Sequence, residues 1–370
     1  MRDETVTATG EADRTLAAFA LVPGWIAVGV LISIVAAGVS IPLRYRWVPL
    51  AVSVLVVGFP HGAVDHHLLA RVRDDSTPRG ALARVGATYA VLGGGYALAW
   101  FFLPRVAVTV FLLVTIVHWG TGELYPLIGI AGVDHLGSST SRLATAAIRG
   151  VLPVLGPLVA FPDRFSSVVS LLVTPFLGTS PPWVAALGDP QVRAAIATSV
   201  AVAVIATLAF GAVRARAVDA VPPHGTQPTS RVDAIVRPRT AVGGWLLDAC
   251  ETVLLCAFFL VVPPVLAVGT YFCLWHSLRH VARLIAVDER STADLADRRI
   301  GQPLWRFGRD ALPLTAGGLL VVVGLFLAVP RSPGTPIESI GVYLAAIAVL
   351  TLPHTVLVAL ADRDQGIGLR

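Results

Sequence analysis

The chain has 370 residues, of which 55% are hydrophobic and only 14% are charged. An average soluble domain carries about 25% charged residues, so this composition predicts a protein embedded in a membrane. All of the basic residues are arginines, and they fall in short segments between apolar runs, which excludes a nucleic-acid-binding surface despite the net charge of +5.

Long apolar segments follow one another along the chain, and a helix needs about 20 such residues to cross a bilayer. We therefore predict an all-α fold, a polytopic transmembrane helical bundle with about ten spans. Residues 165–177 are too short for a span and are predicted to be interfacial or re-entrant, and Pro263–Pro264 predicts a tight hairpin. The predicted spans are 18–42, 47–69, 81–103, 106–127, 143–161, 192–213, 245–262, 264–286, 311–330 and 338–361.

The polar segments define the expected organisation around a single transmembrane domain, 18–362. Residues 1–17 and 363–370 are predicted tails, and about 214–244, rich in Pro, Thr and Arg, is a predicted disordered or loosely packed loop. The start of the chain lacks the features of a signal peptide. Arginines concentrate in loops after even-numbered spans, which predicts a multi-pass protein of the cell (plasma) membrane with both termini in the cytoplasm.

The histidines give the clearest functional signal. Seven of the nine histidines, all except His135 and His224, lie in predicted spans that run in the same direction. The first histidine of each such span lies about 12–16 residues, or roughly 18–24 Å, from its outer end. Ionisable residues at this depth are costly, so their common level predicts a site.

The stretch 58–69, GFPHGAVDHHLL, is the most unusual of these spans. Its glycines and proline loosen the helix, which is tolerated in a membrane only where protein or ligand covers the freed backbone groups. His61 and Asp65 lie one turn apart, so Asp65 is predicted to orient His61 or a neighbouring imidazole. His66 and His67 point away from His61 and are expected near the cytoplasmic headgroups.

His276 and His280 are the most informative pair. Residues four apart leave the same face of a helix, so both imidazoles can converge on one metal ion. Ordinary hydrogen-bonded core histidines are the alternative.

His118, in HWGTGELY, lies beside Gly120 and Gly122, which allow a neighbouring helix or a ligand to approach closely. It is a third candidate ligand. Glu123 is predicted to be a supporting carboxylate or an interfacial residue.

Further candidates surround these ligands. His354, after Pro353, is predicted to line the pocket or to bind the metal directly. Asp248 and Glu251 are expected to pair with an arginine, and Cys250, Cys256 and Cys273 to pack in the core. Aromatic residues are expected either to wall an apolar cavity or to pack between helices: Trp119, Tyr271, Phe272 and Trp275.

Imidazole ligands without thiolates suit iron, copper or zinc. Iron(II) with open coordination positions is the choice that allows reaction with dioxygen.

The motifs PHGAVDHH, HWG, YFCLWHSLRH and LPH, in this order, resemble the Brp/Blh family of bacterial and archaeal β-carotene 15,15′-dioxygenases over about 43–362. The resemblance implies an integral membrane enzyme with Fe²⁺ as cofactor and β-carotene and dioxygen as substrates. Its product would be two molecules of all-trans-retinal, commonly supplied to a rhodopsin. The implied iron ligands are His61, His118, His276 and His280. HWG followed by Glu123 departs from the family's HFG or HFS followed by aspartate.

Two other functions fit the same residues. A histidine-box di-iron hydroxylase or desaturase acting on a lipid would use about eight histidines in HxxxH and HxxHH patterns. A non-enzymatic transporter or rhodopsin-accessory protein would use broken helices and midplane histidines to carry protons or ions. Metal stoichiometry distinguishes all three.

Overall fold

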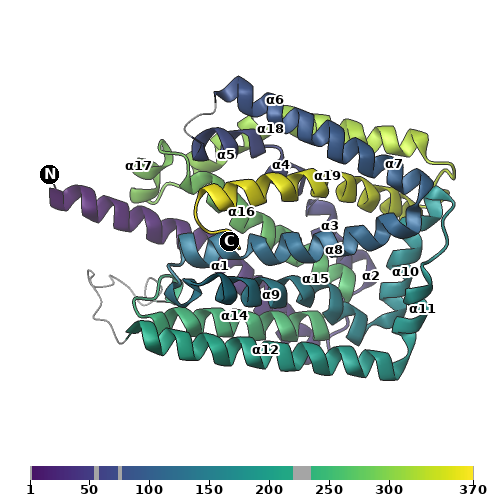
Figure 1. Ribbon diagram of the computed structural model, residues 1–370, viewed down its shortest axis with the longest axis horizontal. Helices are drawn as coiled ribbons and strands as arrows, with labels where there is room; N and C mark the ends of the chain where they lie inside the picture. Colours follow the sequence, from purple (N-terminus) through teal and green to yellow (C-terminus); the bar gives the residue numbers. More distant parts are fainter. Residues whose placement is uncertain (1, 54–57, 74–76, 220–234, 370) are drawn as a thin grey trace.

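The computed structural model describes residues 2–53, 58–73, 77–219 and 235–369. Within these ranges the chain forms helices and no strands, which confirms the predicted all-α class. Most of the long helices run along the longest axis of the molecule (Figure 1).

Eight stretches of the described chain are long and apolar enough to cross a membrane. Their outward surfaces carry large apolar side chains, such as Ile205 and Leu327, as expected for contact with lipid. The helices that contain these stretches are α1 (Arg2–Ala36), α6 (Pro78–Thr88) continuing through η2 (Tyr89–Gly93) into α7 (Gly94–Phe102), α8 (Pro104–Gly122) with η3 (Pro126–Ile130), α9 (Ser139–Ala160), α12 (Pro190–Asp219), α14 (Ala241–Val261), α18 (Gly301–Ala328) and α19 (Pro336–Asp364).

The two remaining predicted spans, 47–69 and 264–286, are irregular. The described part of the first consists of α3 (Val48–Val52), α4 (Phe59–Gly62) and α5 (Asp65–Val72), following the short α2 (Leu43–Arg46). The second consists of α15 (Pro264–Thr270), the π-helical η6 (Tyr271–Ser277) and α16 (Leu278–Ala286). These two spans carry most of the candidate histidines, and π-helical turns are often found at functional sites.

Shorter elements occupy the ends of the bundle. Residues 165–177 form the end of a short helix and a turn, too short for a span, and the break at Val262–Pro263 joins α14 to α15 tightly. These shorter elements are η4 (Asp134–Leu136), α10 (Pro162–Val173), η5 (Thr174–Phe176), α11 (Pro182–Gly188) and α17 (Ser291–Ala296).

Two of the predicted polar segments are partly helical in the structure. Helix α1 already begins at Arg2, so residues 2–17 belong to the first helix. The predicted loop 214–244 is helical at both ends, since α12 continues to Asp219 and α14 begins at Ala241. The Asp219 carboxylate accepts hydrogen bonds from the backbone N–H groups of Ala241 and Val242, at 2.6 and 2.9 Å, and so caps α14. Residues 220–234, with His224, lie outside the described residues.

The backbones of helices α8 and α9 are in close contact at two glycines, Gly120 and Gly150. A Cβ atom at Gly120 would lie 2.1 Å from the carbonyl oxygen of Ala146, and one at Gly150 would lie 2.0 Å from that of Ile116. Only glycine at both positions allows the two backbones to approach this closely. The predicted role of Gly120 is confirmed, and the contact fixes α8 two residues from His118.

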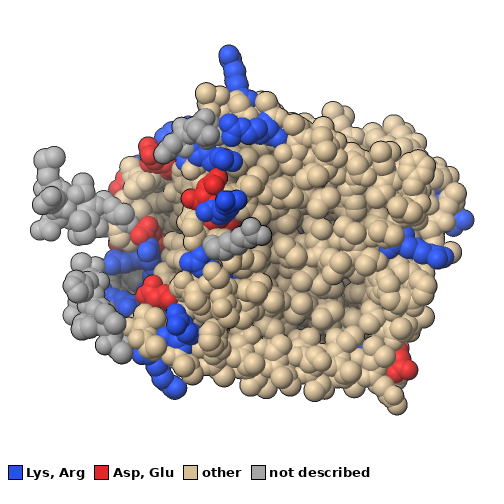
Figure 2. Space-filling view, in the orientation of Figure 1, with Lys and Arg blue, Asp and Glu red and all other residues tan. Residues whose placement is uncertain are grey.

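Charged side chains are unevenly distributed over the surface. Figure 2 shows them gathered mostly at the left end of the view, with a broad uncharged belt beside them. Such a belt is the surface expected for contact with the hydrocarbon core of a bilayer. With the eight apolar stretches, it indicates a multi-pass membrane protein.

Candidate metal centre

Five histidines from four separate segments of the chain meet in the interior. Each is at most 7% exposed. They are His61 of α4, His118 of α8, His276 of η6, His280 of α16 and His354 of α19.

His61, His118 and His276 form the tightest group. One ring nitrogen from each lies within 4.8 Å of those of the others. The Nε2 atoms of His118 and His276 are 3.0 Å apart. Two ligands about 2.1 Å from one metal ion and at right angles to each other are about 3 Å apart, so this spacing suits a shared ion. Gly122 allows the approach, because a Cβ there would lie 3.0 Å from Cε1 of His276.

His280 and His354 also lie close to His61. The ring of His61 lies at centroid distances of 5.8 Å from that of His276 and 5.5 Å from that of His280, so both belong to the cluster. His280, however, shares its closest group of ligand atoms with Asp65 and His354, not with His118 and His276.

His354 is central to the cluster. Its ring centroid lies 5.0 Å from that of His61, 4.9 Å from that of His118 and 5.2 Å from that of His280. His354 was predicted to line the pocket or to bind the metal directly, and its ring lies among those of the other histidines.

Asp65 holds His354 in one orientation. Both carboxylate oxygens lie near Nδ1 of His354, at 2.8 and 3.0 Å, and the Tyr89 hydroxyl donates to Oδ2 of Asp65 at 3.1 Å. A proton on Nδ1 leaves Nε2 of His354 as the acceptor nitrogen. The orienting role predicted for Asp65 therefore falls on a neighbouring imidazole, the second of the two options.

Histidine nitrogens that lack a hydrogen-bond partner show whether a metal ion fits the cluster. Nε2 of His280 and Nε2 of His354 are buried and have no hydrogen-bond partner among the described residues. Buried polar atoms are normally paired, and a carboxylate–histidine pair with a free second nitrogen is the usual arrangement of a metal-binding histidine. Neutral imidazoles in this number fit a transition metal such as iron.

A cavity of about 430 Å³ runs past the cluster, and its wall is almost wholly apolar. His61, His118 and His354 contribute to the wall, as do Trp119 and Phe272. The cavity is therefore a place where an apolar molecule can lie against the histidines.

Two of the predicted aromatic residues are not among the residues that line this cavity. Tyr271 packs edge-on against Trp119, at a centroid distance of 5.2 Å. Trp275 donates from Nε1 to Glu123 at 3.0 Å. Tyr271 and Trp275 therefore contact Trp119 and Glu123 and do not line the cavity.

His66 and His67 are not part of the cluster. Their rings lie against each other at 4.1 Å, and His67 lines a small pocket with Arg71 and Asp288. This agrees with their predicted position away from His61.

A family model described as beta-carotene 15,15′-dioxygenase matches residues 52–362, which include all five histidines. The chain belongs to the β-carotene 15,15′-dioxygenase family. The resemblance predicted from the histidine motifs is thus confirmed.

Individual relatives support the same assignment. The chain is 44% identical over 360 residues to "Probable beta-carotene 15,15′-dioxygenase Blh" of Halobacterium salinarum, a match that covers 97% of this chain and 96% of the relative. It is 26% identical over 346 residues to "Probable beta-carotene 15,15′-dioxygenase Brp" of the same species, covering 90% and 88%. A "Beta-carotene 15,15′-dioxygenase" of an uncultured marine bacterium is 31% identical over 77 residues, covering 21% and 28%. No solved structure matches the chain.

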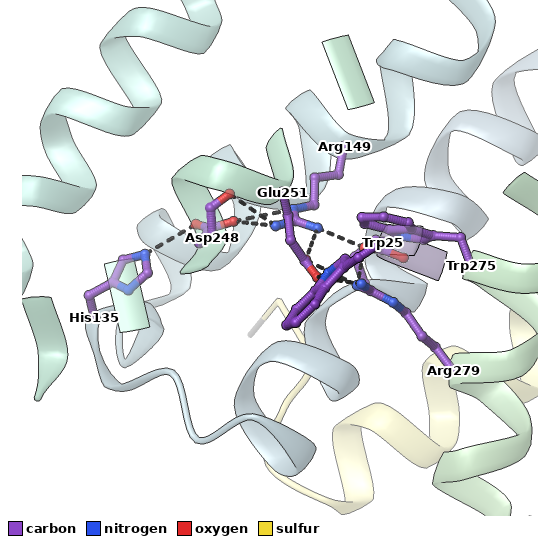
Figure 3. A network of polar contacts seen from close by, with 8 residues as sticks. Trp25, His135, Arg149, Asp248, Glu251, Trp275 and Arg279 are labelled. Atoms are coloured by element: carbon purple, nitrogen blue, oxygen red, sulfur yellow. Dashed lines mark hydrogen bonds and ion pairs between the residues drawn. The ribbon is translucent and has the colours of Figure 1, made fainter. Parts of the chain in front are cut away.

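This member of the β-carotene 15,15′-dioxygenase family also has a buried ion network (Figure 3). Arg149 of α9 contacts Glu123 at 2.8 Å, Glu251 at 2.7 Å and Asp248 at 2.7 Å. Arg279 contacts Glu123 at 2.9 Å and also pairs with Glu251. Two guanidinium groups are therefore surrounded by three carboxylates, all at most 2% exposed.

The network joins the elements that carry the ligands. Glu123 follows His118 by five residues, and Arg279 lies between His276 and His280. Trp25 of α1 donates to Glu251 at 2.6 Å, and His135 lies 3.2 Å from Asp248. Breaking a buried ion pair leaves an uncompensated charge, so the network resists any relative movement of these helices.

Sequence reasoning found only part of this β-carotene 15,15′-dioxygenase family site. The expected pairing of Asp248 and Glu251 with arginine is confirmed, and Glu123 belongs to the ion network. Arg149 and Tyr89 were not singled out. Arg149 had a visible signal, because an arginine inside an apolar span is itself unusual.

Proposed function

We propose that this protein cleaves the central 15,15′ double bond of β-carotene with dioxygen, giving two molecules of all-trans-retinal, at one iron(II) ion held by the buried histidines. The convergence of these histidines on the wall of an apolar cavity carries the proposal. The names of the relatives support the same substrate and reaction.

The proposed iron ligands are His61, His118, His276 and His280, as the family resemblance implies, with His354 as a further nitrogen ligand or an immediate neighbour. The bound iron would supply the redox chemistry that activates dioxygen. Asp65 and Tyr89 fix the orientation of the His354 ring. No general acid or base is required for this reaction.

The cavity is proposed to position the polyene and exclude water. Along α19 its lining runs from Leu344 to His354, and ten helical residues span about 15 Å. The distance of about 15 Å from Leu344 to His354 is half the length of the proposed substrate. The substrate is roughly 30 Å long, about as long as the hydrocarbon core is thick. A substrate whose end lies near Leu344 would have its middle at the histidines, which favours central cleavage.

A dinuclear centre is the second candidate, because the ligand atoms fall into two groups of three. It would make the protein a di-iron enzyme acting on a lipid. Asp65 argues against it, since both of its oxygens already face Nδ1 of His354 and one accepts from Tyr89. Near two irons per chain in purified protein would favour the dinuclear centre, and one iron per chain the mononuclear one.

The decisive experiment incubates purified, iron-loaded protein with β-carotene under ¹⁸O₂ and separates the products by chromatography. We expect two molecules of retinal for each β-carotene, with label in both aldehydes. Absence of retinal, from protein shown to be folded and to contain iron, would refute the proposal. A transporter or accessory protein would hold no metal tightly.

We further propose that the protein lies in the cell membrane with both termini in the cytoplasm, and that its retinal is passed to a rhodopsin. The gathering of charged side chains at one end of the molecule supports this orientation. Reporter fusions at the two termini, active only on the cytoplasmic side, test it. Retinal transfer is tested by pigment formation with co-expressed opsin.

A further inference from the structure

Part of the cavity wall is also part of the outer surface. Leu82 of α6 and Leu314 and Val321 of α18 line the cavity and are 45%, 36% and 37% exposed. Gly86 and Gly317, on the same two helices, are likewise exposed and line the cavity. The cavity therefore reaches the surface along these two helices.

The packing of α6 and α18 explains this opening. Helix α6 packs mainly on α5 and η2, whereas α18 packs mainly on α4 and α19. A Cβ atom added at Gly86 or at Gly317 would have no atom within 4 Å. Figure 1 shows both helices at the upper edge of the bundle. Small residues thus leave open space on each side of the gap.

The exposed leucines and valine beside this gap belong to helices long enough to cross a membrane. An opening at this place faces hydrocarbon chains. From it the cavity continues past His61, His118 and His354 and reaches Phe165 and Val168 of α10.

We propose that the gap between α6 and α18 is a lateral portal through which the carotenoid enters from the bilayer. This inference rests on the proposed function. A hydrocarbon polyene has no group that hydrogen-bonds to water, so it stays dissolved in the membrane. An entrance that opens to lipid lets it reach the histidines without crossing an aqueous phase.

The test narrows the portal from each side with Gly86→Phe and Gly317→Phe. Matched controls are Gly95→Phe on α7 and Gly324→Phe on α18, because both glycines are exposed, have open space around a Cβ and do not line the cavity. Each protein is purified from cells that make β-carotene. Iron content, thermal melting, retained carotenoid and kcat/KM with β-carotene in phosphatidylcholine vesicles are measured.

We expect both portal variants to keep their iron and melting temperature while retained carotenoid and kcat/KM fall at least tenfold, and both controls to match the wild type. Wild-type retention and turnover in the two portal variants would overturn the portal. If one portal variant does not fold, the other tests the same gap from the opposite helix.

Retained carotenoid separates this inference from the proposed function. A wild-type protein that retains β-carotene but releases no retinal would refute the proposed reaction. The comparison of retention between portal and control variants would still decide the portal.

Discussion

Nδ1 of His354 lies 2.8 Å from Oδ2 of Asp65, although 289 positions separate the two residues in the chain. This contact joins α5 to α19 inside the bundle. It also determines which nitrogen of His354 faces the other histidines, since the proton is directed toward the carboxylate.

The first prediction concerns Asp65→Asn. The amide keeps the size of the side chain but removes the charge that orients and polarises His354, so we expect iron affinity to fall about 10- to 100-fold. Competition with a chelator measures the affinity. Tyr89→Phe, which removes one hydrogen bond to Asp65, should have a smaller effect. Unchanged affinity in Asp65→Asn would show that Asp65 plays no part in metal binding.

The second prediction concerns the proposed ligands themselves. We expect His276→Ala and His280→Ala each to abolish iron retention through purification, because each removes an imidazole that lies beside that of His61. His67→Ala is the matched control, since that imidazole lies outside the cluster and should leave the iron content unchanged. Metal analysis of the purified proteins gives the answer. A full complement of iron in either ligand variant would contradict its assignment.

The third prediction distinguishes His354 as ligand from His354 as neighbour. If Nε2 of His354 binds the iron, His354→Ala should weaken iron binding at least tenfold and change the spectrum of the ferrous–nitrosyl complex. His354→Gln, which retains a polar group at this place, should restore part of the affinity. An unaltered spectrum and affinity in His354→Ala would limit its role to lining the cavity.

The fourth prediction concerns the ion network. Arg149→Met leaves three buried carboxylates with one guanidinium group, and removing one partner from a buried pair costs about 3–5 kcal/mol. We expect a large drop in melting temperature, measured in detergent, and loss of iron as α8 and α16 separate. Arg105→Met, at an exposed arginine, is the control and should melt like the wild type. Equal melting of the two variants would mean that the network contributes little to stability.

The helical class and the histidine site could be predicted because both depend on local, strong effects. A membrane imposes helices on apolar segments, and a histidine within such a segment is costly enough to indicate a function. Gly120, close to His118 in the sequence, was predicted to allow the close approach of a neighbouring helix, and α9 does approach it. The glycines and proline around His61 predicted a loosened helix, and α4 does end at Gly62.

The remainder depends on contacts between distant segments, which one sequence does not reveal. Asp65 could serve His61 or another imidazole, and only the packing of α5 on α19 selects His354. Arg149 and Glu123 are 26 positions apart, and Arg279 and Glu123 are 156 apart. Asp219, which caps α14 together with Thr240, is 22 residues earlier in the chain than Ala241. The sequence was consistent with Trp275 either lining a cavity or packing between helices. The structure shows that it donates a hydrogen bond to Glu123.

The glycine contact between α8 and α9 has a mechanical consequence. Where Gly120 meets Ala146 and Gly150 meets Ile116, main chain rests on main chain, so no rotamer change can alter the spacing of the two helices. His118 and Arg149 lie within two residues of this contact and must shift together or not at all. The backbone of His118 is therefore held at a fixed position relative to α9, and only rotation of its own side chain can change how far the imidazole reaches toward the cavity.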